Sequence, residues 1–190
     1  MSGKNNVLVN SGLYTISSVL VNAISFLLLP VYTMFLTPND YGVTNLVSSF
    51  TNVASIIISF SLYSSVSRFY VDYKEDRERL KAFYGTIIIF ILFTGLILMV
   101  LGVIFQRILI DFFFRGFTFY PILFICLLNM IFVCQYTIHQ RMMQSMHQGK
   151  KYTIVNLTFF ICAVCLNLLF IVVIKLGATG VLLATLIINI

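Results

Sequence analysis

Hydrogen-bonding side chains recur at helical spacing in the first two long apolar segments of this chain of 190 residues. In the first segment they are separated by steps of four, three, four and three residues, and in the second by three, four, three and four. Such steps place each set on one face of a helix. The two polar stripes are Ser11, Thr15, Ser18, Asn22 and Ser25, and Asn45, Ser48, Asn52, Ser55 and Ser59.

Serine, threonine and asparagine both donate and accept hydrogen bonds, so two adjacent stripes would line a hydrated cavity that suits a hydroxyl-rich substrate. Close packing is the alternative, because the same small polar residues hold membrane helices together. The asparagines favour the cavity, since the packing of small residues does not require them. All ten side chains are therefore candidate substrate contacts.

Other site chemistry finds little support in the sequence. No Asp, Glu, Lys or Arg lies in the middle of an apolar segment, which argues against a proton- or sodium-coupled site in this part of the chain. Arg68 lies just beyond the second segment, as either a contact for an anionic headgroup or an ordinary cytoplasmic anchor. Cys162 and Cys165 have the spacing of a redox or metal motif, but no second pair accompanies them. We expect no catalytic residue, no cofactor and no metal.

The composition indicates that these segments lie in a membrane. The chain is 60% hydrophobic and only 9% charged, with a mean hydropathy of +1.02, whereas about a quarter of the residues of a soluble domain are charged. Apolar runs near the roughly 20 residues that cross a bilayer must be helical, because lipid offers the backbone no hydrogen-bond partner. The fold class is an all-α polytopic membrane protein with about six transmembrane helices forming one bundle.

The expected helices span residues 7–35, 43–66, 83–105, 119–138, 152–174 and 178–190. The last of these is still apolar at Ile190 and is shorter than a bilayer requires. We therefore expect that the natural chain continues and that a C-terminal bundle is missing here.

The net charge of +6 and the pI of about 9.3 are explained by the loops rather than by nucleic acid. Cytoplasmic loops of membrane proteins carry an excess of Lys and Arg. If the expected helices all cross the membrane, nine Lys and Arg residues lie on the side of the N-terminus and three on the other side. The N-terminus is therefore predicted to be cytoplasmic. The nine are Lys4, Arg68, Lys74, Arg77, Arg79, Lys81, Arg141, Lys150 and Lys151, and the three are Arg107, Arg115 and Lys175.

The connection between the two stripes, residues 30–42, is predicted to be an outward-facing hairpin. Its sequence Thr37-Pro38-Asn39-Asp40 is a strong turn signal, because proline fixes φ while Asn and Asp bond their own backbone. Asp40 or Thr37 could also cap the helix that follows.

Several motifs resemble one family of membrane proteins. Leu-Leu-Leu-Pro-Val-Tyr-Thr at 27–33 and Leu-Thr-Pro-Asn-Asp-Tyr-Gly at 36–42 resemble the first-hairpin signature of bacterial polysaccharide flippases. These proteins export O-antigen and capsule repeat units and belong to the multidrug/oligosaccharidyl-lipid/polysaccharide superfamily. Ser-Val-Ser-Arg-Phe-Tyr at 65–70, Gln-Gly-Lys-Lys-Tyr at 148–152 and Leu-Gly-Ala-Thr-Gly at 176–180 are similar to later landmarks of that family.

The resemblance implies a transporter of two bundles around a central cavity, with this chain as the N-terminal bundle. It implies transport rather than catalysis. In this transport, an oligosaccharide on undecaprenyl pyrophosphate moves from the cytoplasmic to the periplasmic leaflet of the bacterial inner membrane. The implied partners are the lipid bilayer, the polyprenyl-linked oligosaccharide and the C-terminal half, with the polysaccharide polymerase and chain-length machinery as further candidates. Met34 stands where the family commonly has arginine, so a basic contact for pyrophosphate is not available there.

Three alternatives stay open. A drug or cation antiporter of the same superfamily would need a membrane-embedded carboxylate, which these segments lack. A membrane-embedded glycosyl- or acyltransferase would need polar loops with paired carboxylates or histidine. A chain that ends at Ile190 would be a truncated, non-transporting membrane protein.

Overall fold

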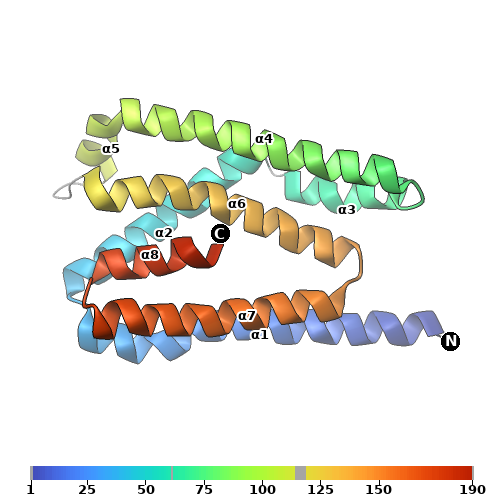
Figure 1. Ribbon diagram of the computed structural model, residues 1–190, viewed down its shortest axis with the longest axis horizontal. Helices are drawn as coiled ribbons and strands as arrows, with labels where there is room; N and C mark the ends of the chain where they lie inside the picture. Colours follow the sequence, from blue (N-terminus) through green and yellow to red (C-terminus); the bar gives the residue numbers. More distant parts are fainter. Residues whose placement is uncertain (1, 61, 114–118, 190) are drawn as a thin grey trace.

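The structure is a computed structural model that describes residues 2–60, 62–113 and 119–189, and its long helices run along one common axis (Figure 1). Within this part of the chain, five segments are long and apolar enough to cross a bilayer. The predicted class, an all-α polytopic membrane protein, is confirmed. The long helices are α1 (Ser2–Phe35), α2 (Pro38–Ser59), α4 (Arg77–Ile104), α6 (Phe124–Ser145) and α7 (Gly149–Leu168). The shorter elements are α3 (Leu62–Tyr73), α5 (Gln106–Phe113), α8 (Ala178–Asn189) and two π-helical segments, η1 (Phe119–Leu123) and η2 (Leu169–Val173).

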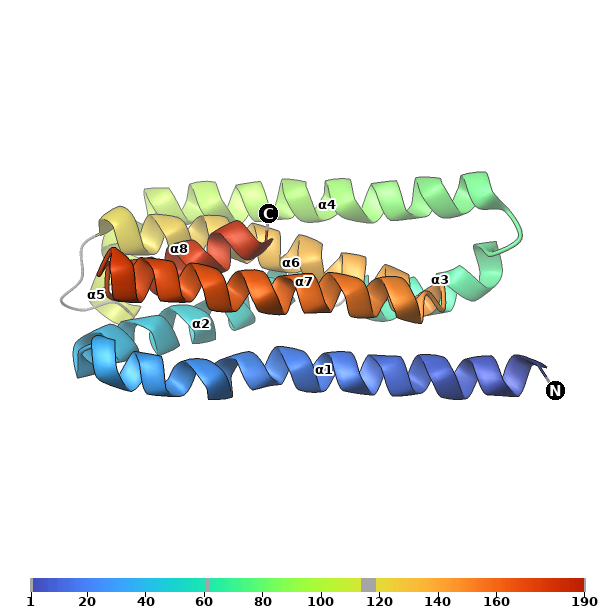
Figure 2. The ribbon, with the colours of Figure 1, turned by 60° about the horizontal axis from the view of Figure 1, so that its bottom comes forward.

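Helix α1 lies along α7, far from it in the sequence, while α2 follows α6 (Figure 2). The hydroxyl of Ser17 on α1 donates to that of Thr153 on α7 at 3.0 Å. The rings of Tyr14 and Tyr152 meet edge to face, with centroids 5.1 Å apart. Since each member of the first hairpin has a different partner, α1 and α2 diverge from the turn that joins them.

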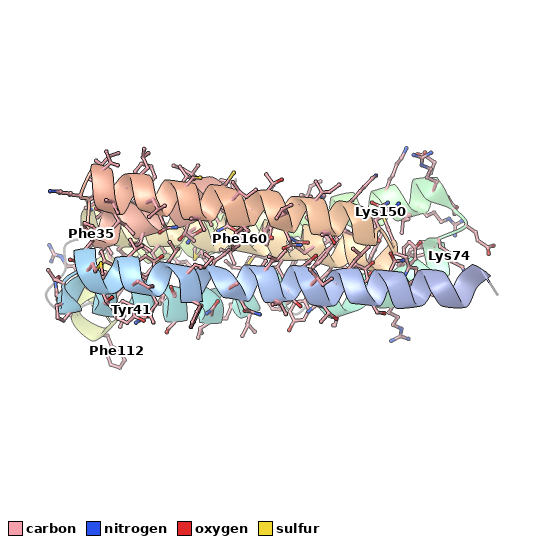
Figure 3. All side chains as sticks on the ribbon, turned by 90° about the horizontal axis from the view of Figure 1, so that it is seen from below. Phe35, Tyr41, Lys74, Phe112, Lys150 and Phe160 are labelled. Carbon is pink, nitrogen blue, oxygen red and sulfur yellow. The ribbon has the colours of Figure 1, made fainter. Side chains whose placement is uncertain are left out.

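The two ends of the bundle differ in charge, and its sides are apolar. Figure 3 shows Lys74 and Lys150 at one end and Tyr41 at the opposite end, so the basic segments and the first hairpin lie far apart. Along α4, one face of large apolar side chains is more than half exposed. This face is Ile89, Phe93, Leu96 and Val100. Such a surface suits lipid, in which apolar side chains need no further cover.

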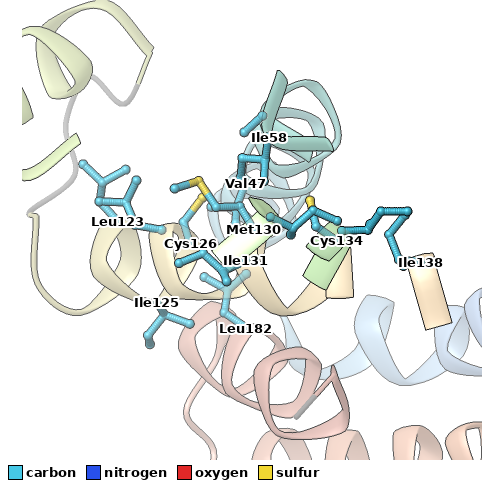
Figure 4. Packing of buried hydrophobic residues seen from close by; sticks show 14 of the residues in the cluster. Val47, Ile58, Leu123, Ile125, Cys126, Met130, Ile131, Cys134, Ile138 and Leu182 are labelled. Carbon is cyan, nitrogen blue, oxygen red and sulfur yellow. The ribbon is translucent and has the colours of Figure 1, made fainter. Parts of the chain in front are cut away.

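Helix α6 forms the centre of the bundle, because it packs against α2, α3, α4, α7 and α8. Its side chains Met130, Cys134 and Ile138 are almost fully buried. Figure 4 shows them with Val47 of α2 on one side, while Leu182 of α8 lies below α6. Lipid is as apolar as this core, so close packing rather than transfer out of water stabilises the contact.

The segment predicted as one helix over residues 43–66 is divided in the structure. Helix α2 ends at Ser59, and Phe60 has a left-handed backbone with φ of 44°, which is costly for a residue with a Cβ. The Ile58 carbonyl near the break accepts a hydrogen bond from the hydroxyl of Thr94 on α4 at 3.1 Å. This bond supplies the partner that a backbone carbonyl requires inside a membrane.

Other boundaries also differ from those predicted. Helix α3 runs to Tyr73, so Arg68 lies within a helix instead of in a loop. Helix α4 begins six residues earlier than expected, where the Oδ1 atom of Asp76 accepts from the backbone N–H of Arg79 at 3.1 Å. Tyr120 has an extended backbone, so α6 itself begins later than expected. Arg115 lies outside the described residues.

A glycine on α4 packs closely against α6. A Cβ added at Gly95 would lie 2.9 Å from Cγ1 of Ile131, whereas one added at Gly85 on the same helix would meet open space. Gly95 therefore lets α4 and α6 pack closely, whereas a larger residue would push the two helices apart. Small residues have this role in membrane bundles.

We expect Gly95→Ala to lower the free energy of unfolding by about 1–3 kcal/mol through overpacking against Ile131. The matched control, Gly85→Ala, should be neutral or stabilising by up to about 1 kcal/mol, because alanine favours the helix. Thermal unfolding of the purified variants in detergent measures the difference. Equal shifts for the two variants would contradict the close α4–α6 contact.

Candidate substrate cavity

Helix α2 begins with a reciprocal cap built from the predicted turn. Thr37 is the N-cap, and its hydroxyl oxygen accepts from the Asp40 backbone N–H at 3.2 Å. The Oδ2 atom of Asp40 accepts in return from the Thr37 backbone N–H at 3.1 Å and from its hydroxyl at 2.7 Å. The prediction that Thr37 or Asp40 caps this helix is confirmed, and both take part.

The second carboxylate oxygen of Asp40 reaches another helix. Oδ1 accepts from the backbone N–H of Ala178, the first residue of α8, at 3.3 Å. Gly177 precedes it with φ of +57°, and a Cβ there would come within 3.1 Å of the same oxygen. A carboxylate at a helix N-terminus is also favoured by the helix dipole. This contact, here called the Asp40 bridge, joins the first hairpin to the turn before α8.

A cavity of about 480 Å³ lies between α1, α2, α7 and α8. Tyr41, at its edge, belongs to the end of the bundle that carries the hairpin (Figure 3). Its apolar lining includes Leu28 of α1, Phe159 of α7 and Val181 of α8. Its polar lining is Tyr32, Tyr41, Thr44, Asn45, Ser48, Asn167 and Thr185.

One hydrogen bond crosses the wall of the cavity. The hydroxyl of Tyr32 on α1 donates to Oδ1 of Asn167 on α7 at 3.1 Å. The Asn167 amide donates in turn to the carbonyl of Ala163, one turn earlier in α7, at 2.8 Å. Asn167 is only 4% exposed, so this pair holds α1 against α7 and keeps a polar group at the cavity wall without leaving it unsatisfied.

The other polar side chains leave hydrogen-bonding capacity toward the cavity. Thr44, Ser48 and Thr185 donate to carbonyls of their own helices, which leaves lone pairs on their oxygens. Tyr41 and Asn45 make no side-chain hydrogen bond within the described part of the chain, and both are exposed. The cavity therefore offers both donors and acceptors, and none of its described lining residues is Asp, Glu, Lys or Arg.

The structure separates the ten predicted contact residues into groups. Asn45 and Ser48 line the cavity. Ser55 and Ser59 line a small pocket of about 40 Å³ between α2, α3 and α6. Asn52 is exposed and lies between the two groups in the sequence. All five residues of the second stripe belong to α2 and lie on one face of it.

The described side chains of the first stripe do not line this cavity. Thr15, Ser18 and Asn22 are exposed on α1 and donate to carbonyls of that helix at 2.9–3.0 Å, and Ser11 is exposed as well. The side chain of Ser25 lies outside the described part of the chain. Helix α1 instead contributes Tyr32 and apolar residues to the lining, because α1 packs on α7 and not along α2. Substrate contacts by the first stripe stay a prediction.

Sequence reasoning missed five polar lining residues, which are Tyr32, Tyr41, Thr44, Asn167 and Thr185. Asn167 could have been identified from the sequence, because it is an amide within an otherwise apolar run of α7. Burying such an amide in a membrane costs free energy, which points to a function. Tyr32 lies in the hairpin motif at 27–33, but its partner is distant in the sequence. Arg68 is exposed on α3 and is not among the described residues that line this cavity.

Residues 7–190 match the family described as polysaccharide biosynthesis protein. The chain belongs to this family. The match confirms the resemblance drawn from the hairpin and the later landmarks, and it indicates a general role in polysaccharide synthesis or transport. Members of the family are transporter-like, and the apolar helices indicate a multi-pass protein in a lipid bilayer. No curated protein and no solved structure matches the chain.

We expect Asp40→Ala to lower the free energy of unfolding by about 1–3 kcal/mol, because it removes the cap of α2 and the acceptor for Ala178. Hydrogen exchange at the Ala178 amide should accelerate in the same variant. The neighbouring Asn39→Ala serves as the matched control, since Asn39 is exposed and lies outside the bridge. An unchanged exchange rate at Ala178 would contradict the Asp40 bridge.

Proposed function

We propose that this chain is the N-terminal bundle of a transporter that flips an oligosaccharide linked to undecaprenyl pyrophosphate, from the cytoplasmic to the periplasmic leaflet, for surface polysaccharide synthesis. The observation that carries the proposal is the cavity between α1, α2, α7 and α8, whose described lining includes hydroxyl and amide side chains and no charged residue. Membership of the polysaccharide biosynthesis family supports the same substrate class.

The physical problem of flipping is that sugar hydroxyls lose their water in the bilayer. A buried hydroxyl without a hydrogen-bond partner costs about 1–3 kcal/mol in proteins, and an oligosaccharide carries many of them. Side chains such as Asn45 and Ser48 replace water by donating and accepting. The polyprenyl tail needs no such help, because it can stay in the lipid beside the bundle.

The break between α2 and α3 supports a transporter as well. Discontinuous helices are a recurring feature of transporters, in which they accompany alternating access. The α2 helix carries Thr44, Asn45 and Ser48 at one end and Phe60 at its other end. A change of backbone conformation at Phe60 would change the angle between α2, which forms one wall of the cavity, and α3.

The distribution of charge supports the proposed orientation. Lys74 and Lys150 lie at the end opposite Tyr41 (Figure 3), as expected if the basic end faces the cytoplasm and the hairpin faces the periplasm of the inner membrane. Arg68, exposed on α3, is a candidate contact for the anionic pyrophosphate on the cytoplasmic side. The C-terminal half, the polymerase and the chain-length machinery belong to the same proposal as partners.

We expect Asn45→Leu to reduce polysaccharide export by about tenfold, which corresponds to the loss of about 1.4 kcal/mol of hydrogen bonding to the sugar. Complementation of a strain that lacks the gene, with protein levels checked by immunoblotting, measures this effect. Thr86→Leu on α4, which does not line the cavity, should leave export unchanged.

Asn52→Leu provides the sharper comparison, because Asn52 belongs to the same stripe but lies outside the cavity lining. We expect it to reduce export less than Asn45→Leu does. If Asn45→Leu leaves export intact while the protein is present at its normal level, this cavity does not carry the substrate.

A further inference from the structure

The cavity between α1, α2, α7 and α8 restricts the charge of what it can hold. Among the described lining residues, the polar side chains are hydroxyls and amides. A phosphate or carboxylate placed among them would lose hydration and find no cation, and an ammonium group would find no carboxylate. The lining therefore favours an uncharged, hydroxyl-rich ligand.

The charged residues Asp40 and Lys175 lie close in the sequence to lining residues of the cavity, and neither is itself among the described lining residues. Asp40 already accepts hydrogen bonds from Thr37 and Ala178 on both carboxylate oxygens. Lys175 lies in the turn before α8 and is exposed. An ion in the cavity would thus have no charged group of the lining to pair with.

The size of the cavity limits how much of the substrate it can take. A volume of about 480 Å³ is within the range of about 300–1,000 Å³ typical of small-molecule pockets. A whole lipid-linked oligosaccharide does not fit, so a part of the glycan must be the occupant. The aromatic side chains of Tyr41 and Phe159 line the cavity and supply apolar surface for the C–H groups of a sugar, and Asn45 offers an amide for its hydroxyls.

We infer that this cavity is a binding site for an uncharged sugar residue of the transported glycan, and that the pyrophosphate binds elsewhere. The inference rests on the proposed function for the identity of the glycan, but the site itself can be tested without transport. Tyr41 and Asn45 are its specificity-determining residues.

The test measures the binding of soluble methyl glycosides to the full natural chain in detergent by saturation-transfer NMR. The neutral probes are methyl glucoside, methyl galactoside, methyl rhamnoside and methyl N-acetylglucosaminide, and the anionic probe is methyl glucuronide. We expect at least one neutral glycoside to bind at least tenfold more tightly than the glucuronide. Equal or tighter binding of the glucuronide, or no binding of any neutral probe, would overturn the inference.

Variants locate the binding in this cavity. Tyr41→Leu and Asn45→Leu should each weaken the neutral glycoside about tenfold, whereas Thr86→Leu should have no effect. Asn45→Lys should raise the affinity for glucuronide relative to the neutral probe at least tenfold, a gain that misfolding cannot produce. Unchanged selectivity in Asn45→Lys would place the sugar outside the cavity and contradict the inference.

Flipping of a lipid-linked oligosaccharide in reconstituted vesicles separates the two proposals. If the neutral glycosides bind as expected but no lipid-linked oligosaccharide is moved, the proposed function fails and the sugar site stands. If oligosaccharides are moved but the glucuronide binds as well as the neutral probes, the inference about sugar charge fails alone.

Discussion

The arrangement of the hairpin end of this bundle depends on one carboxylate that accepts hydrogen bonds at the beginnings of two helices. The two oxygens of Asp40 accept from Thr37 at the start of α2 and from Ala178 at the start of α8. Inside or near a membrane these N–H groups have few other partners, so a shared acceptor is strongly favoured. Gly177 is required beside it, because its backbone has a positive φ and the carboxylate occupies the place of a side chain. Two sequence landmarks, at 36–42 and 176–180, thereby meet in space.

The cavity follows from how the first hairpin is held. The Asp40 bridge fixes the turn, after which α1 follows α7 and α2 follows α6. Two helices that start together and then take different partners leave a space between them, which α8 partly fills. The bond between Tyr32 and Asn167 sets one wall of this space, and the polar face at the start of α2 forms another. Tight packing around α6 keeps the remainder of the bundle dense, and polar side chains buried there, such as Gln140 and Asn156, bond to each other.

The sequence predicts the helices well, because apolar runs in a membrane have few alternatives to helix. It does not predict the break at Phe60, since neither glycine nor proline is present there and Thr94, which bonds to the carbonyl of Ile58, is 36 residues from Ile58. Periodicity also identifies the polar face of α1 without identifying its neighbour. The partner is α7, and the contacts that decide it, such as Ser17 with Thr153, are 136 residues apart. The cap at Thr37 was predictable because its whole geometry lies within four residues, whereas the bond from Asp40 to Ala178 was not.

The central claim is that the glycan passes through the cavity beside the first hairpin. The most direct measurement is photo-crosslinking in native membranes, with a photoreactive benzoyl-phenylalanine in place of Phe159, which lines the cavity, in one variant and of Phe93, on the exposed face of α4, in another. Mass spectrometry then identifies the adducts. The account predicts an adduct with the lipid-linked oligosaccharide at position 159 and adducts with phospholipid alone at position 93. An oligosaccharide adduct at position 93, or its absence at position 159 while polysaccharide is being exported, would contradict the account.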